Sequence, residues 1–264
     1  MTDEIRRSES GDLAESLRRP TPARLLVGRA AEAYRTATQL QLRADHAAAR
    51  DAVGRELDLA RDLGVELVER WRLFEVRSRA VSKSDYLLRP HLGRDLDQAA
   101  RQEIAQRCPA GAALQIVIGD GLSARAVAAQ VPLLLPALAA EAQRRGWSLG
   151  QPFVVRHCRV GIMNVVGELL RPSVEVLLIG ERPGMSTAQS LSAYLAYQPR
   201  AGHSDAERNL VSNIHACGVP PEAAAVRIAG FAAELLRLRR SGAEVKEPSS
   251  ERLGPGDAPI RGLS

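Results

Sequence analysis

The chain has 264 residues, of which 45% are hydrophobic and 25% charged, and its formal net charge is +5. This composition is that of a globular protein and excludes a largely disordered chain. The sequence has no run of five basic residues and no stripe of aromatic and basic side chains, which argues against a nucleic-acid-binding protein. Aromatic residues make up only 3% of the chain, so we expect a core of Leu, Val, Ile and Ala.

The cysteines and the apolar segments bear on where the protein works. The three cysteines, Cys108, Cys158 and Cys217, form no C-x-x-C pair, so we expect free thiols in a reducing compartment. The amino-terminal residues are polar, unlike a secretory signal. The longest apolar stretch, residues 126–140, contains two prolines and is too short to span a bilayer. The expected location is therefore cytoplasmic.

The first part of the chain is expected to be mainly helical. Residues 1–20 are polar and predict a flexible amino terminus, and residues 21–105 predict a mainly helical amino-terminal region. Within this region, apolar residues follow a helical pattern from residue 34 to 62. The pattern ends before Gly64, a residue type that often caps helices. Residues 65–80 are ambiguous between helix and strand.

In residues 106–242, expected strands alternate with expected helices. Short apolar runs predict the strands, and the longer amphipathic stretches predict the helices. The expected strands are 114–119, 152–158, 174–180 and 190–199, the last at an edge, and the expected helices are 123–145, 163–170, 205–215 and 220–240. This alternation predicts an α/β fold with a mostly parallel sheet flanked by helices. Residues 243–264, rich in Gly, Pro, Ser and charge, predict a disordered tail.

Distinctive loops follow three of the expected strands. They are GDGLS at 119–123, RHCRVG at 156–161 and GERPG at 180–184. The carboxyl ends of parallel strands meet at one edge of a sheet, where ligands bind in open α/β folds, so function is expected at that edge. In the third loop, Pro183 and Gly184 predict a turn. Glu181 and Arg182 before it are either held there for function or simply solvated.

The first loop raises an alternative function. IVIGDGLSA matches G-x-G-x-x-A between a strand and a helix, the fingerprint of a dinucleotide-binding oxidoreductase. However, Asp120 would repel a phosphate there, and the position of the expected ribose-binding acid falls in a helical stretch, near Glu141. The other interpretation is a glycine turn in which Ser123 caps the next helix and Asp120 stabilises the turn or the helix start.

No set of residues for independent catalysis is recognisable in the sequence. H-E-x-x-H, G-x-S-x-G and G-x-x-x-x-G-K-[ST] are absent, as is D-x-H-x-x-G, by which some proteins donate a histidine to the cobalt of cobalamin. The histidines form no close metal-binding pair, and we expect them to be structural or surface residues: His46, His91, His157, His203 and His215. We therefore assign no catalytic or metal-ligating residue.

Several longer segments, taken together, match a known family. Between residues 21 and 242 they occur in the order GRA, LRADHAAARDAV, EVRSRA, YLLRPHLGR, QIVIGDGLSA, PFVVRH, VVGELL, LLIGERPG, SLSAYLAY and VSNIHA. This series resembles the small (light) subunit of ethanolamine ammonia-lyase. Because several long motifs lie in register, the resemblance is far more specific than a lone G-x-G.

The resemblance implies a function, a cofactor and a partner. That family forms one half of an adenosylcobalamin-dependent enzyme, which converts ethanolamine to acetaldehyde and ammonia by radical chemistry. It implies a Rossmann-like domain that closes over the cobalamin at the interface with a large subunit, in a hetero-oligomer. The substrate is bound mainly by the large subunit, and the cofactor carries the chemistry. This accounts for the absence of recognisable catalytic residues in this chain. No membrane or nucleic-acid partner is implied.

The resemblance also implies three cofactor-binding residues. Val160 of RHCRVG and Glu181 of GERPG match the family's cofactor-contacting positions. The third position is Leu210, where family members often have cysteine. A contact through the backbone or through packing would survive this change, whereas a sulfur-specific contact would not. Val160 and Leu210 would contact the apolar face of a corrin, and Glu181 would accept a hydrogen bond from its amide rim or a ribose hydroxyl.

Two further expectations concern location and rival functions. Some relatives carry a longer amino-terminal extension that directs them into a microcompartment, but this chain begins close to its expected core, so encapsulation is not favoured. The rivals to a cobalamin-lyase subunit are the dinucleotide-binding oxidoreductase and an interaction module without a cofactor.

Overall fold

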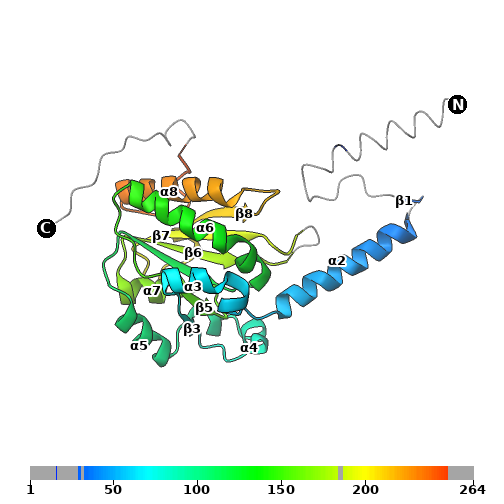
Figure 1. Cartoon of the computed structure of the whole chain (residues 1–264), viewed down its shortest axis with the longest axis horizontal. Helices are drawn as coiled ribbons and strands as arrows, with labels where there is room; N and C mark the ends of the chain where they lie inside the picture. Colours follow the sequence, from blue (N-terminus) through cyan, green and yellow to red (C-terminus); the bar gives the residue numbers. More distant parts are fainter. Residues whose placement is uncertain (1–15, 17–28, 31–32, 184–186, 249–264) are drawn as a thin grey trace.

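The computed structural model describes most of the chain, namely residues 16, 29–30, 33–183 and 187–248. The prediction of a flexible amino terminus over residues 1–20 lies outside the described residues, except at residue 16. Of the tail predicted over residues 243–264, residues 249–264 also lie outside the described residues, whereas Val245 is buried and packs in the core. The described residues form a sheet with helices on both faces, and one long helix projects from this body (Figure 1). The α/β fold predicted from the sequence is therefore confirmed.

The central sheet has six strands in the order β3-β5-β4-β6-β7-β8. The strands are β3 (Glu75–Arg77), β4 (Leu114–Gly119), β5 (Phe153–Arg156), β6 (Val174–Gly180), β7 (Leu191–Tyr197) and β8 (Asn209–Ile214). The first four strands in this order pair in parallel, whereas β7 pairs antiparallel with both β6 and β8. The sheet is thus mixed but mostly parallel. A separate short hairpin consists of β1 (Arg29–Ala30) and β2 (Ala33–Tyr34).

Helices cover the two faces of the sheet. The described helices are α2 (Thr36–Gly54), which projects from the body, α3 (Val65–Trp71), α4 (Lys83–Leu88), α5 (Gln98–Arg107), α6 (Ala124–Arg144), α7 (Ile162–Leu170) and α8 (Pro221–Leu238), with short turns η1 (Leu59–Leu63), η2 (Leu92–Arg94) and η3 (Asp205–Glu207). One core layer joins α6, α8 and η1 to the sheet, which we call the α6–α8 face. A second core layer joins α5 and α7 to the opposite side, the α5–α7 face.

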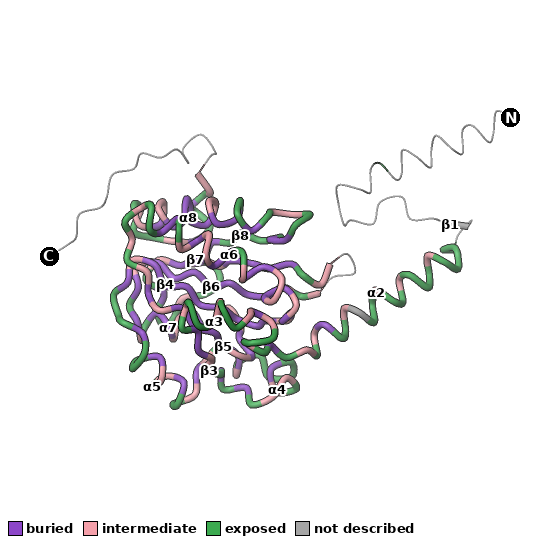
Figure 2. The backbone as a smooth tube through the Cα atoms, viewed as in Figure 1, coloured by how far each residue is buried: buried purple, intermediate pink, exposed green. Residues whose placement is uncertain are grey.

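The strands form where apolar residues run continuously. Every residue of β4 and β6 is buried, as expected for parallel strands covered by helices on both sides. Alternate residues serve the two core layers, so that Val176 packs on the α6–α8 face and Leu177 on the α5–α7 face. Burying one such side chain contributes about 1.5–3 kcal/mol. Figure 2 shows β4 and β6 buried throughout and α2 largely exposed.

Two sequence-based predictions in the second half of the chain are wrong. The segment 190–199 was expected at an edge, but β7 lies between β6 and β8. The segment 205–215 was expected to be helical, but it forms η3 followed by the edge strand β8. In β8, buried Asn209 and Val211 alternate with exposed Leu210. Pairing with β7 therefore outweighs the local helical tendency of these residues.

The amino-terminal region combines helices with one strand of the main sheet. The ambiguous segment 65–80 contains both α3 and β3, and β3 pairs with β5. The helical pattern from residue 34 to 62 corresponds to α2 and η1, separated by an extended break that begins at Arg55. Gly64 has a positive φ of 85° and caps η1 through its N–H, as its position suggested.

Helix α6 is longer than the apolar stretch at residues 126–140, which was judged too short to span a bilayer. Its 21 residues extend beyond the apolar stretch seen in the sequence, and by length and composition alone it is able to cross a membrane. Half of its most apolar window is buried, and its buried residues pack on the sheet and α8. A core helix of a globular protein has these same properties.

Candidate functional site

The three distinctive loops meet at one edge of the sheet, as predicted. They follow the neighbouring parallel strands β4, β5 and β6. The N–H of Leu122 donates to the carbonyl of Gly180 at 3.1 Å, which joins the first loop to the third. The N–H of Cys158 donates to Oδ1 of Asp120 at 3.0 Å, which joins the second loop to the first. The carboxyl edge of the parallel strands is thus one connected structure.

The close approach of the first and third loops requires glycine. Gly121 has a φ of +55°, and a Cβ there would lie only 2.3 Å from the carbonyl oxygen of Gly180. Ser123 caps α6, because its hydroxyl accepts from the N–H of Ala126 at 3.2 Å. The prediction of a glycine turn followed by a serine cap is therefore confirmed.

Asp120 stabilises a different part of the molecule from the one expected. Its side chain is fully buried, and its hydrogen bond goes to the loop after β5 and not to its own helix start. Nζ of Lys83 lies 3.9 Å from Oδ2 of Asp120 and donates to the carbonyl of Gly121 at 3.0 Å. Burial lowers the pKa of Lys83, and the charge of Asp120 opposes this shift. The carboxyl group of Asp120 therefore occupies the interior of the loop that a dinucleotide phosphate would have to approach.

Val160 lies on a firmly held segment between β5 and α7. The preceding residue, Arg159, receives support twice: its N–H donates to the carbonyl of Gly93 at 2.8 Å, and its guanidinium donates to the carbonyl of Tyr86 at 3.0 Å. The Val160 side chain is half-buried and packs against the core of the α5–α7 face. Its exposed part is thus presented from a rigid support.

Glu181 is neither simply solvated nor free. It follows β6 directly, and its N–H donates to the carbonyl of Ser190 at 3.0 Å. Its Oε1 accepts from the hydroxyl of Ser192 at 2.6 Å and from the N–H of Asn213 at 3.1 Å. Glu181 therefore ties together the ends of β6, β7 and β8. No described residue donates a hydrogen bond to its other oxygen, Oε2. Arg182 beside it is exposed.

Leu210 lies on the same side of the sheet as Glu181. It stands opposite Tyr194 of β7, which in turn stands opposite Leu177 of β6. Leu177 packs on the α5–α7 face, so Leu210 belongs to that face as well. The side chain remains 45% exposed, because the helices of this face do not extend over the edge strand. Alternation from Leu177 places Glu181 on this face too.

Sequence reasoning missed a polar bridge behind these residues. The side-chain amide of Asn164 in α7 donates to the carbonyl of His203 at 2.8 Å. The Asn164 oxygen accepts from the guanidinium of Arg208 at 2.9 Å. One available signal was the single asparagine in the otherwise apolar segment IMNVVGELL. The pairing of Asn164 with Arg208 was not predictable, because residues 205–215 were expected to form a helix instead of η3 and β8.

The histidines and cysteines behave as predicted. Nδ1 of His157 lies 3.0 Å from the carbonyl oxygen of Ala80, and Nε2 of His215 lies 2.7 Å from the side-chain oxygen of Asn213. Both of these histidines are buried and structural, and the others are exposed or half-exposed: His46, His91 and His203. The three cysteines are free. Among the residues that the structure describes, no group of three His, Cys, Asp or Glu side chains is able to hold a metal ion.

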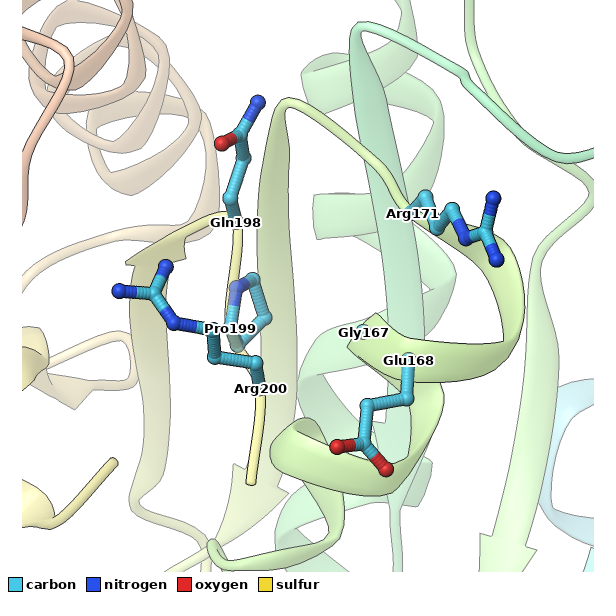
Figure 3. A pocket seen from close by; sticks show the side chains of 6 residues that line it. All are labelled: Gly167, Glu168, Arg171, Gln198, Pro199 and Arg200. Carbon is cyan, nitrogen blue, oxygen red and sulfur yellow. The ribbon is translucent and has the colours of Figure 1, made fainter. Parts of the chain in front are cut away.

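A surface cavity of about 470 Å³ lies at the opposite end of the sheet (Figure 3). It is lined by Gly167, Glu168, Arg171, Gln198, Pro199 and Arg200. The guanidinium groups of Arg171 and Arg200 point away from each other, so they do not converge on one ligand. None of the predicted site residues lines this cavity.

Comparison with known proteins gives a consistent assignment. The profile of the family "Ethanolamine ammonia-lyase light chain" matches residues 11–246. Similar proteins include three ethanolamine ammonia-lyase small subunits. The one from Fusobacterium nucleatum is 40% identical over 87% of this chain and 76% of its own length. The one from Clostridium perfringens is 38% identical over 86% of this chain and 75% of its own length. The one from Rhodopseudomonas palustris is 42% identical over 88% of this chain and 89% of its own length. This chain therefore belongs to the ethanolamine ammonia-lyase light chain family and is the small subunit of an ammonia-lyase.

Proposed function

We propose that this subunit holds adenosylcobalamin against a large catalytic subunit, in a cytoplasmic enzyme that converts ethanolamine to acetaldehyde and ammonia. The observation that carries the proposal is the state of Glu181. One of its oxygens is fixed by Ser192 and Asn213, and its other oxygen has no hydrogen-bond donor among the described residues. A carboxylate held rigidly with one open oxygen is suited to accept a hydrogen bond from a ligand.

The residues around Glu181 fit the chemistry of a corrin. A corrin combines a broad apolar face with a rim of amide N–H donors, so a site for it needs aliphatic surface beside a fixed acceptor. Leu210 offers exposed aliphatic surface on the same sheet face as Glu181, and Val160 offers a second, half-buried aliphatic side chain. When bound, the cobalamin would supply the radical chemistry. The residues of this chain would orient the cofactor and exclude water from it.

The Rossmann-like part of the proposal concerns residues 106–242. We propose that this segment forms the cobalamin-facing domain, with β3 added to its sheet from the mainly helical region 21–105. The buried Asp120 argues against the alternative, a dinucleotide-binding oxidoreductase, because it repels phosphate. Millimolar NAD is therefore expected to leave the melting temperature unchanged. A rise that scales with NAD concentration would support the alternative.

A separate surface is suited to the large subunit. Val81, Leu87 and Leu88 are exposed by 66%, 42% and 78%, and they lie on α4 and the segment before it. The bond from Lys83 to Gly121 ties this segment to the carboxyl edge of the sheet. Large exposed aliphatic side chains grouped on one segment are typical of a surface that a partner covers. We propose that the large subunit docks here, beside the cofactor.

A cofactor titration of the assembled two-subunit complex tests the proposal. Hydrogen bonds to a charged acceptor contribute about 1.5–3 kcal/mol, so Glu181→Ala is expected to weaken cobalamin binding by about 10- to 150-fold. Glu181→Gln is expected to lose less affinity, because an amide oxygen still accepts. Assembly with the large subunit should survive in both variants.

The matched control is Glu168→Ala. Glu168 is an exposed glutamate near the far end of the sheet that also accepts a backbone hydrogen bond, from the N–H of Ala201 at 3.0 Å. This variant is expected to bind cobalamin normally. Wild-type affinity in the Glu181→Ala variant would mean that the Glu181 carboxylate serves only the sheet, and the proposed contact would be rejected.

A further inference from the structure

Two of the proposed cofactor-contacting residues lie on different elements that a partly buried polar bridge connects. Val160 lies just before α7, and Asn164 is in the first turns of that helix. Leu210 lies in β8, and Arg208 immediately precedes that strand. The guanidinium of Arg208 donates to the side-chain oxygen of Asn164 at 2.9 Å. This hydrogen bond therefore links the element that carries Val160 to the element that carries Leu210.

The bridge is held from both sides. Arg208 is only 4% exposed, and its guanidinium also pairs with Asp205 at the start of η3. The amide of Asn164 donates in turn to the carbonyl of His203, so one side chain grips the segment 203–208 at two points. A buried arginine that pairs with two side chains has restricted freedom of rotation. The bridge is thus able to fix the distance between α7 and the segment that leads into β8.

Val160 and Leu210 are both joined closely to the elements that the bridge connects. Val160 accepts a hydrogen bond through its carbonyl from the N–H of Met163 at 3.2 Å, so it is joined to the first turn of α7. Leu210 follows Arg208 by two residues, within a strand paired to β7. A displacement of β8 relative to α7 would therefore move Leu210 relative to Val160.

We infer that Asn164 and Arg208 are positioning residues that fix the separation of Val160 and Leu210, and thereby the affinity for the corrin face. This inference rests on the proposed function, since it assumes that Val160 and Leu210 contact the cofactor. Neither Asn164 nor Arg208 needs to touch the cofactor. Their effect is transmitted through the elements on which the two aliphatic side chains lie.

A set of variants in the assembled two-subunit complex tests this inference with hydroxocobalamin as the probe. Binding is measured by equilibrium dialysis, and folding by thermal denaturation of the same samples. Asn164→Ala removes both hydrogen bonds and is expected to weaken hydroxocobalamin binding about 3- to 10-fold, in the lower part of the range for coupling between neighbouring groups. Asn164→Asp retains an acceptor for Arg208 and is expected to bind within about twofold of wild type.

Rescue by Asn164→Asp separates positioning from simple stability. The aspartate loses the donor to His203, so a role limited to holding that carbonyl would leave Asn164→Asp as weak as Asn164→Ala. Arg208→Gln is expected to weaken hydroxocobalamin binding as much as Asn164→Ala does. The double variant that combines these two substitutions should lose no more affinity than either single variant. Arg200→Gln is the matched control: Arg200 is an exposed arginine in the segment that leads to β8, and its loss is expected to leave affinity unchanged.

The outcomes distinguish this inference from the proposed function. If the wild-type complex fails to bind hydroxocobalamin, the proposed function itself fails. If Glu181→Ala weakens binding while Asn164→Ala and Arg208→Gln bind like wild type, the proposed function stands and the positioning role is rejected. Additive losses in the double variant would also reject it, because two residues that act through one bridge cannot lose that bridge twice.

Discussion

The two faces of the sheet differ in composition and in cover. Towards the α6–α8 face, β4 and β6 present only apolar residues, and the long helices α6 and α8 cover the sheet as far as β8. Towards the α5–α7 face, the same two strands present Gln115 and Glu175 among the apolar residues, and both are fully buried. On this face the shorter helix α7 leaves Tyr194 half-buried and Leu210 exposed.

This difference separates the part of the molecule that stabilises the fold from the part that is suited to binding. A fully covered apolar layer contributes stability but offers no surface to a ligand. The incompletely covered face carries the buried polar groups, the bridge between Asn164 and Arg208, and the open oxygen of Glu181. Substitutions at three positions, Leu135, Glu175 and Leu210, test this difference between the two faces.

The largest effect is expected in the core of the α6–α8 face. Leu135 in α6 is fully buried there, so Leu135→Ala is expected to lower the free energy of unfolding by about 2–5 kcal/mol through lost burial and a cavity. Chemical denaturation measures this loss. Leu133 on the same helix is 54% exposed, and Leu133→Ala is expected to change stability by less than about 0.5 kcal/mol. Equal losses in the two variants would contradict the assigned packing.

A smaller effect of opposite sign is expected from Glu175 on the α5–α7 face. Burial raises the pKa of Glu175 well above its usual range, and the charge of Arg208 only partly opposes this shift. An acid with a raised pKa makes folding less favourable as the pH rises above its value in the unfolded chain. Glu175→Gln is therefore expected to raise the free energy of unfolding at pH 7 by about 1 kcal/mol, because a neutral glutamine can be buried without first protonating a carboxylate.

The pH dependence checks the sign of this prediction. Below about pH 4 the carboxyl group is protonated in both the folded and the unfolded chain, so the advantage of Glu175→Gln is expected to disappear there. Denaturation curves at several pH values measure this trend. Glu103→Gln on the exposed surface of α5 is the control, with little expected change in stability. A loss of stability in Glu175→Gln at pH 7 would show that Glu175 is ionised and fully compensated by Arg208.

The smallest effect is expected at Leu210 in the edge strand. Leu210→Cys places a sulfur atom at this position, and it is expected to change cobalamin affinity by less than about fivefold, since only a small apolar area is lost. Stability should change little, because the side chain is already 45% exposed. Leu210→Asp is the contrasting variant and is expected to weaken cobalamin binding clearly. A tenfold or greater gain in Leu210→Cys would instead indicate a sulfur-specific contact.

Much of the fold was predictable because its strands are continuous apolar runs. LQIVIG and VEVLLIG are unambiguous as buried strands, and the serine cap at Ser123 follows from its position before a helix. The edge strand was not predictable in this way. NLVSNI alternates between buried and exposed residues over only a few positions, and the preceding residues favour a helix. Its identity as a strand is decided by pairing with β7, which no local pattern reports.

The candidate site was predictable from two signals only, namely the loops that follow the parallel strands and the motifs that resemble the family. The meeting of the three loops follows from parallel pairing, so their common edge was correctly predicted. The role of Asp120 was not, because its partner, the N–H of Cys158, lies 38 residues away in the chain. The anchoring of Glu181 by Ser192 and Asn213 likewise depends on strands that come together only in the folded sheet.

The order of the strands has a consequence for how the subunit assembles. Strand β5 lies between β3 and β4, although it follows both of them in the chain. Among the strands that the structure describes, β3 pairs only with β5, so it has no place in the sheet until β5 has added to β4. The segment after β3 carries the exposed aliphatic side chains of Val81 and Leu88. If the large subunit docks at this segment as proposed, an incompletely folded subunit would lack the finished surface, and recognition by the partner would select chains that have completed their sheet.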